Sequence, residues 1–172
     1  WHPYTAVERS VNIIDAAKRF GLPAPANRIA NDLMAHAQII AKRLEYFGEH
    51  NTSNHLANNG RGLYKIGCTL DLKNTRNLGF KILINEAKRL FLSNGMLREG
   101  STHYHLILLK NYLDVWLSAK RYLYHADATA FEQIALKALG AAQMINLPGG
   151  MPLIGDISPD SPPSFLNGIQ HA

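Results

Sequence analysis

The side chains best suited to chemistry gather in two segments, and the first lies at residues 49–65. Here Asn54, Asn58, Arg61 and Lys65 are spaced i, i+4, i+7 and i+11, so a helix would place them on one polar stripe. His55 lies on the flank of that stripe. Two interpretations are open. The stripe is either the solvated amide face of an amphipathic helix or a polar surface that binds an anionic ligand.

Two further features of this segment bear on that choice. Each glycine in a helix interior costs about 1 kcal/mol relative to alanine, which predicts either close backbone packing or a surface that a ligand approaches. The glycines in question are Gly60, Gly62 and Gly67. The polar loop 50–55 precedes the helix, and helix N-termini favour anions such as a sugar carboxylate. Ser53 or Asn54 as an ordinary N-cap explains only part of that loop.

The second segment opens a strongly apolar helix. Arg98 and Glu99 precede His103, Tyr104 and His105. Histidine and tyrosine act as general acids or bases when they are positioned, although a buried ring with one hydrogen bond explains any one of them. The two histidines lie about 200° apart on a helix and cannot chelate one ion together. The sequence has neither an HExxH zinc motif nor a GxSxG nucleophile motif.

The elements that must position these residues are helices. Apolar periodicity predicts six, at about residues 5–20, 26–47, 54–70, 75–92, 103–122 and 128–145. Proline and glycine dominate after residue 146. We therefore predict an all-α fold of antiparallel helical hairpins over 1–146, followed by a Pro/Gly-rich loop or linker at 147–172.

Composition narrows the class of protein without naming it. Hydrophobic residues make up 47% and charged residues 18%, as in globular domains, and no apolar run is long enough to cross a bilayer. The single Cys68 excludes an internal disulfide and is expected to be buried. The net charge of +5 suits an anionic partner, but no basic tract points to nucleic acid. The opening residues 1–4 lack an initiator Met and a leader, which predicts an excised or trimmed chain.

Four motifs, in order, resemble one known family. Segments 1–14, 49–70, 97–116 and 152–156 look like the start of the helical domain, the asparagine/histidine helix, the Tyr-His helix and the following loop of the heparinase II/III-like polysaccharide lyases. This resemblance implies an incomplete α/α toroid, truncated at its N-terminus, with a β-sandwich domain beyond the chain. It also implies a periplasmic or secreted location, no cofactor within these residues, and a family in which many members carry a metal in the sandwich.

The resemblance further implies an activity: β-elimination in acidic, uronate-containing polysaccharides such as glycosaminoglycans. Asn54 or His55 would neutralise the sugar carboxylate, and Tyr104 would transfer the proton. The expected substrate-binding residues are Asn58, Arg61, Arg98, Glu99 and His105, with no metal ligand among these residues. By itself the chain would form about half of an active site and be inactive.

Two other classes of protein fit the same sequence. A helical glycan-binding scaffold, associated for example with polysaccharide biosynthesis, needs the same polar groove without turnover. A generic helical regulatory or nucleic-acid-binding bundle needs no groove. A β-rich segment beyond this chain, carrying a suitably placed histidine, would favour the lyase.

Overall fold

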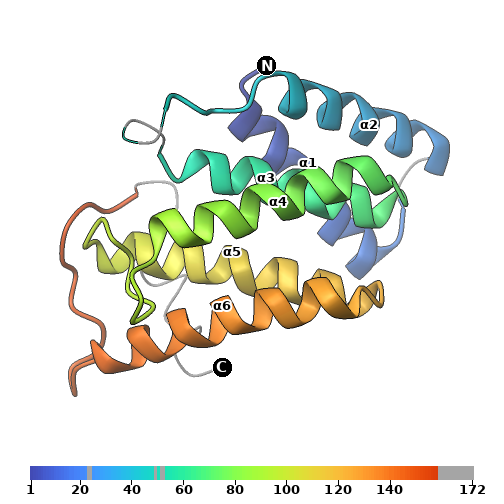
Figure 1. Ribbon diagram of the computed structural model, residues 1–172. Coiled ribbons are helices and arrows are strands. Elements are labelled where there is room, and N and C mark those ends of the chain that lie inside the picture. Colours follow the sequence, from blue (N-terminus) through green and yellow to red (C-terminus); the bar gives the residue numbers. More distant parts are fainter. Residues whose placement is uncertain (23–24, 49, 51–52, 159–172) are drawn as a thin grey trace. The chain divides into compact units, whose positions relative to one another are not determined.

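Helices account for nearly all of the regular structure. The computed structural model describes residues 1–22, 25–48, 50 and 53–158. Within these residues the chain forms six helices (Figure 1) and, apart from two isolated bridges, no β-structure. The helices are α1 (Pro3–Phe20), α2 (Ala26–Lys42), α3 (His55–Thr69), α4 (Lys73–Leu90), α5 (Thr102–Arg121) and α6 (His125–Met144). The predicted all-α fold class is confirmed.

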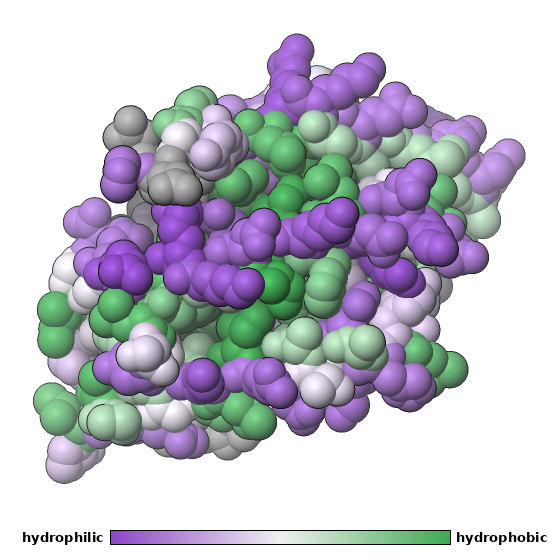
Figure 2. All heavy atoms as spheres, in the orientation of Figure 1, coloured by the Kyte–Doolittle hydropathy of each residue, from purple (hydrophilic) through white to green (hydrophobic). Residues whose placement is uncertain are grey.

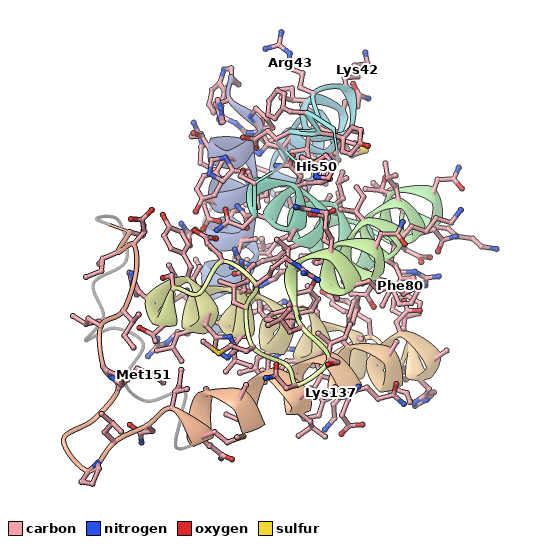
Figure 3. All side chains as sticks on the ribbon, turned by 60° about the vertical axis from the view of Figure 1, so that its left-hand side comes forward. Lys42, Arg43, His50, Phe80, Lys137 and Met151 are labelled. Carbon is pink, nitrogen blue, oxygen red and sulfur yellow. The ribbon has the colours of Figure 1, made fainter. Side chains whose placement is uncertain are left out.

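The end of α2 is the one boundary that the sequence analysis places wrongly by more than a few residues. The apolar pattern predicts a helix to Phe47, whereas α2 ends at Lys42. The next residues leave the helix because the backbone N–H of Glu45 donates to Oδ1 of Asn59, 3.0 Å away on α3. In Figure 3, Lys42 and Arg43 mark the end of α2, and His50 marks the segment leading on to α3.

Residues 1–86 form one compact unit, and the division from the second unit falls within α4. Helices α1, α2 and α3 pack around a core of aliphatic side chains, whose members include Val7, Val11, Leu33, Ile40, Leu63 and Ile66. Burying such side chains stabilises a fold by about 1.5–3 kcal/mol each. Cys68 is buried, as expected.

The glycines of α3 allow its neighbours to approach closely. A Cβ at Gly62 would lie 2.6 Å from Cγ2 of Val7 on α1. A Cβ at Gly79 of α4 would lie 2.4 Å from the backbone nitrogen of Tyr64 and 2.7 Å from the carbonyl oxygen of Gly60. Neither position can take a Cβ unless the neighbouring atoms shift. Of the two readings of these glycines, close backbone packing is therefore what the structure shows.

Residues 87–172 form the second unit, and α5 and α6 make an antiparallel hairpin within it (Figure 1). The buried face of α6 is mostly alanine, at positions 128, 135, 138, 141 and 142, which lets the two helices pack closely. The loop after α4 reaches α6 at Gly95, where a Cβ would lie 2.3 Å from the carbonyl oxygen of Lys137, labelled in Figure 3. Residues 146–158 are irregular, as predicted, whereas 159–172 lie outside the described residues.

Hydrophilic side chains run along the exposed side of α4, as Figure 2 shows. Lys81, Asn85 and Lys88 are exposed there at helical spacing. Within the described residues, no helix combines the length and the apolar character that a membrane crossing requires.

Candidate functional site

The polar stripe of α3 is occupied by carboxylates of α1. Glu8 Oε1 accepts hydrogen bonds from Asn58 Nδ2 at 2.9 Å and from Arg61 Nη1 at 3.0 Å. Further along both helices, Lys65 Nζ donates to both carboxylate oxygens of Asp15 at 2.9 Å. Asn58, Arg61 and Lys65 are buried. The interpretation of this stripe as a solvated face is therefore wrong.

These contacts also fix the relation of α1 to α3. Because Glu8 pairs with the earlier residues of the stripe and Asp15 with the later one, the two helices run in the same direction. Asn58 and Arg61 were expected to bind substrate, and that expectation stays a prediction. Their geometry shows that they hold α1 against α3.

Beside this stripe, His55 forms a pair with a buried carboxylate. Its Nδ1 lies 2.8 Å from Oε1 of Glu45, whose side chain is only 7% exposed. The other carboxylate oxygen, Oε2, accepts from Asn59 Nδ2 at 2.9 Å. Since an ionised carboxylate can only accept, the proton between His55 and Glu45 resides on Nδ1.

The His55 side chain is only partly covered. The side chain is 44% exposed, and within the described residues the structure gives Nε2 no partner. The ring of Tyr4 packs at 4.9 Å from the imidazole, with the planes tilted by 48°. Asn54 precedes α3, half-buried, and its side chain makes no capping hydrogen bond. The polar loop 50–55 lies in part outside the described residues.

Tyr104 occupies the first turn of α5 in the second unit and is half-buried. Its backbone N–H donates to Oγ of Ser101 at 3.0 Å, which makes Ser101 the N-cap of the helix. The hydroxyl of Ser101 in turn donates to the carbonyl oxygen of Asp156 at 2.7 Å. The start of α5 is therefore tied to the irregular segment near the end of the described chain.

That segment, residues 152–158, bonds each of the three residues that precede Tyr104. Besides Ser101, Thr102 donates its hydroxyl to the carbonyl oxygen of Pro152 at 2.6 Å and its N–H to that of Ile154 at 3.0 Å. His103 Nδ1 accepts from the backbone N–H of Ser158 at 2.9 Å, and its buried Nε2 has no hydrogen-bond partner among the described residues. The 152–158 segment thus fixes the backbone on which Tyr104 stands.

His105 is buried with both ring nitrogens engaged by the backbone. Nδ1 accepts from the N–H of Leu97 at 3.2 Å, so the proton is on Nε2, which donates to the carbonyl oxygen of Ala138 at 2.8 Å. Burial lowers the pKa of His105, against an opposing effect of the Ala138 hydrogen bond. The predicted contact of His105 with substrate stays a prediction. The two hydrogen bonds of its ring connect the 91–100 loop to α6.

Arg98 and Glu99 are exposed before the start of α5. Arg98 Nε donates to the carbonyl oxygen of Arg89 at 3.1 Å. Burial, and then the nearby Asp156 carboxylate, raise the pKa of Glu99. Both residues remain candidates for substrate contact, because neither is sequestered by the fold.

The predicted site residues are divided between the two units. Asn54, His55, Asn58 and Arg61 belong to the first unit, and Arg98, Glu99, Tyr104 and His105 to the second. Their convergence on one groove stays a prediction. Sequence reasoning missed Glu45, because its partners are 10 and 14 positions away and an apolar helical pattern runs through it. Within the described residues no three His, Cys, Asp or Glu side chains are grouped to hold a metal.

The chain is therefore an all-helical domain with polar side chains on both units. One unit carries a histidine held by a carboxylate, and the other carries a tyrosine in the first turn of a helix. The family model of the heparinase II/III N-terminus matches residues 2–167, so the chain belongs to this family.

Two solved structures share the fold. The crystal structure of heparan sulfate lyase HepC from Pedobacter heparinus matches 91% of this chain with a TM-score of 0.71 and 22% sequence identity. The crystal structure of heparinase III matches 87% with a TM-score of 0.69 and 17% identity. The matched regions are 26% and 24% of those chains, so this chain spans about a quarter of their length. No curated protein matches the sequence.

Proposed function

We propose that this chain belongs to a polysaccharide lyase that cleaves acidic, uronate-containing glycans by β-elimination, and that it supplies about half of the active site. Family membership and the likeness to two proteins titled heparan sulfate lyase and heparinase support this reaction class. The observation that carries the assignment is the His55 ring, which Glu45 holds at Nδ1 while the side chain stays 44% exposed.

The chemistry needs two kinds of group. A base removes the proton at C5 of the uronate, the bond from C4 to the glycosidic oxygen breaks, a C4–C5 double bond forms, and the departing oxygen gains a proton. The C5 proton is weakly acidic until the adjacent carboxylate is neutralised, so donors must meet that group. His55, through Nε2–H of the protonated ring, and the uncapped amide of Asn54 are the proposed donors.

Tyr104 is the proposed proton-transfer residue. Its side chain stands on a helix turn that the Ser101 cap and the 152–158 segment hold rigid. Arg98 and Glu99 are proposed to contact the glycan on the same unit, and Asn58 and Arg61 to act through the α1–α3 packing. A β-sandwich domain in the intact protein, with a further histidine and in some cases a metal, would complete the site in a periplasmic or secreted setting.

Elimination is measured by the ultraviolet absorbance of the unsaturated uronate, with the intact protein and a panel of acidic glycans. We expect Tyr104→Phe to lower kcat by about 10²–10⁴-fold while glycan affinity stays near the wild-type value. His55→Ala should lower kcat by about 10²–10³-fold. Tyr124→Phe, at the start of α6, is the matched control and should keep the wild-type rate.

A different result separates the alternatives. An intact protein that binds acidic glycans but gives no absorbance change with any of them would be a glycan-binding scaffold, and the lyase proposal would fail. Full activity in Tyr104→Phe would reject the role of Tyr104 alone.

A further inference from the structure

Glu45 is a buried carboxylate for which the elimination chemistry itself has no use. It lies after the end of α2 and is 6% exposed. Taking an ionised carboxylate out of water is costly unless hydrogen bonds replace the lost hydration. Glu45 reaches this buried position because α2 ends at Lys42. The hydrogen-bond partners of Glu45 therefore indicate its role.

The two close side-chain partners of the Glu45 carboxylate both lie on α3. Oε1 faces His55 Nδ1 at 2.8 Å, and Oε2 faces Asn59 Nδ2 at 2.9 Å. The Asn59 amide is itself fixed, because its Oδ1 accepts the backbone N–H of Glu45 at 3.0 Å. Asn59 therefore holds residue 45 at two points, and neither end of its amide can be exchanged without losing a hydrogen bond. The exposed His2 adds only a longer contact, with Nε2 at 3.7 Å from Oε1.

We propose that Glu45 is a positioning residue that keeps the proton of His55 on Nδ1 and so presents Nε2 to the glycan. In the neutral ring Nε2 is then an acceptor, and in the protonated ring it is a charged donor. The Tyr4 ring limits the tilt of the imidazole. The contact of Nε2 with a uronate carboxylate rests on the proposed function. The orientation and the tautomer of the His55 ring do not depend on it.

The Glu45→Gln variant tests the tautomer through the fixed amide of Asn59. Asn59 Nδ2–H can donate only to the oxygen of the new side chain, so the new NH₂ group must face His55. That group donates to Nδ1, and the ring proton must move to Nε2. Glu45→Gln is therefore expected to invert the neutral tautomer of His55, with little change in shape.

Ring ¹⁵N chemical shifts of the histidines in the 172-residue chain give the readout, with His55→Gln used to assign the His55 signals. We expect the Nδ1–H tautomer in the wild type and the Nε2–H tautomer in Glu45→Gln. Asp15→Asn is the matched control. It removes a carboxylate that is bonded to Lys65, which lies on α3 as His55 does, and it should leave the His55 tautomer unchanged. A wild-type ring with its proton on Nε2 overturns the proposal, and this outcome does not depend on the folding of Glu45→Gln.

Kinetics of the intact protein separate this proposal from the lyase assignment. We expect Glu45→Gln to lower kcat by about 10–100-fold, the range found when the carboxylate behind a metal-binding histidine is replaced, and to change the pH–rate profile. Asp15→Asn should leave the profile unchanged. Elimination with unaltered kcat and pH profile in Glu45→Gln overturns the positioning role and leaves the lyase standing. Absence of elimination in the wild type overturns the lyase, while the Nδ1–H tautomer still supports the Glu45–His55 arrangement.

Discussion

At the scale of single residues, the fold uses polar side chains in pairs that are distant in sequence. Arg61 and Lys65 are buried because Glu8 and Asp15, about fifty positions earlier, stand opposite them. An i, i+4, i+7 stripe states which residues share a face, but not which helix that face meets. The sequence therefore identified the stripe as polar, and it could not reveal that α1 covers it.

Arg61 and Arg98 should differ sharply when each is replaced by alanine. Arg61→Ala removes the cation opposite Glu8, whose side chain is 38% exposed and can be partly rehydrated, so the cost is about 1–3 kcal/mol. Arg98→Ala removes an exposed side chain and should change stability by about 0.5 kcal/mol or less. Urea unfolding of the chain measures both. Equal midpoints for the two variants would contradict the structural role of Arg61.

His105 should make the stability of the second unit depend on pH. Burial lowers its folded-state pKa below the usual 6.5, so the unfolded chain binds the proton more readily. Stability is therefore present above pH 6.5 and is lost as the pH falls from there towards the folded-state pKa. Replacing His105 by Gln should lower the melting temperature at about pH 7.5 but reduce its further fall at about pH 5.5. Burial also lowers the pKa of His36, so the comparison must be made against the wild type at each pH. Parallel curves for the two proteins would refute this.

At the scale of elements, the sequence predicts where helices exist better than where their neighbours lie. Helical periodicity and the Pro/Gly punctuation are local, and all six helices were found from them. The early end of α2 was not, because it depends on hydrogen bonds between Glu45 and Asn59. The glycines of α3 were recognised as unusual, but only the approach of Val7 and Gly79 shows what they allow.

Two glycine-to-alanine changes should act in opposite directions. In Gly79→Ala the new Cβ meets backbone atoms of Tyr64 and Gly60 on α3, which cannot move aside unless the helices separate. We expect overpacking to cost about 1–3 kcal/mol, which exceeds the helix-propensity gain of at most about 1 kcal/mol, so the variant should be less stable than the wild type. Gly140→Ala on α6 has no atom within 4 Å of the new Cβ and should stabilise by about 0.5–1 kcal/mol. Thermal unfolding of both variants is the measurement, and a stabilised Gly79→Ala would show that α3 and α4 are less closely packed.

At the scale of the whole molecule, the net charge and the length of the chain bear on which ligands it can attract and which steps it can carry out. Its net charge of +5 favours acidic polymers over neutral ones without selecting a particular glycan. The solved structures that it resembles are about three and a half times as long, because 91% and 87% of this chain match only 26% and 24% of theirs. The proposed function places sugar selectivity and turnover in the intact protein, and it assigns attraction of the polyanion to these 172 residues.

The 172-residue chain by itself should therefore bind acidic polysaccharide weakly and catalyse no elimination. Calorimetric titration with a uronate-containing polyanion and with a neutral glucan of similar length tests the first half. Binding should be confined to the polyanion and should weaken as salt rises, since exposed charges are screened over about 10 Å at 0.1 M. Ultraviolet absorbance in the same samples tests the second half. Salt-independent binding would assign recognition to contacts other than charge. Measurable elimination would show that the groups within these residues, with Tyr104 and His55 foremost, suffice for the reaction, and the division of the active site proposed above would be wrong.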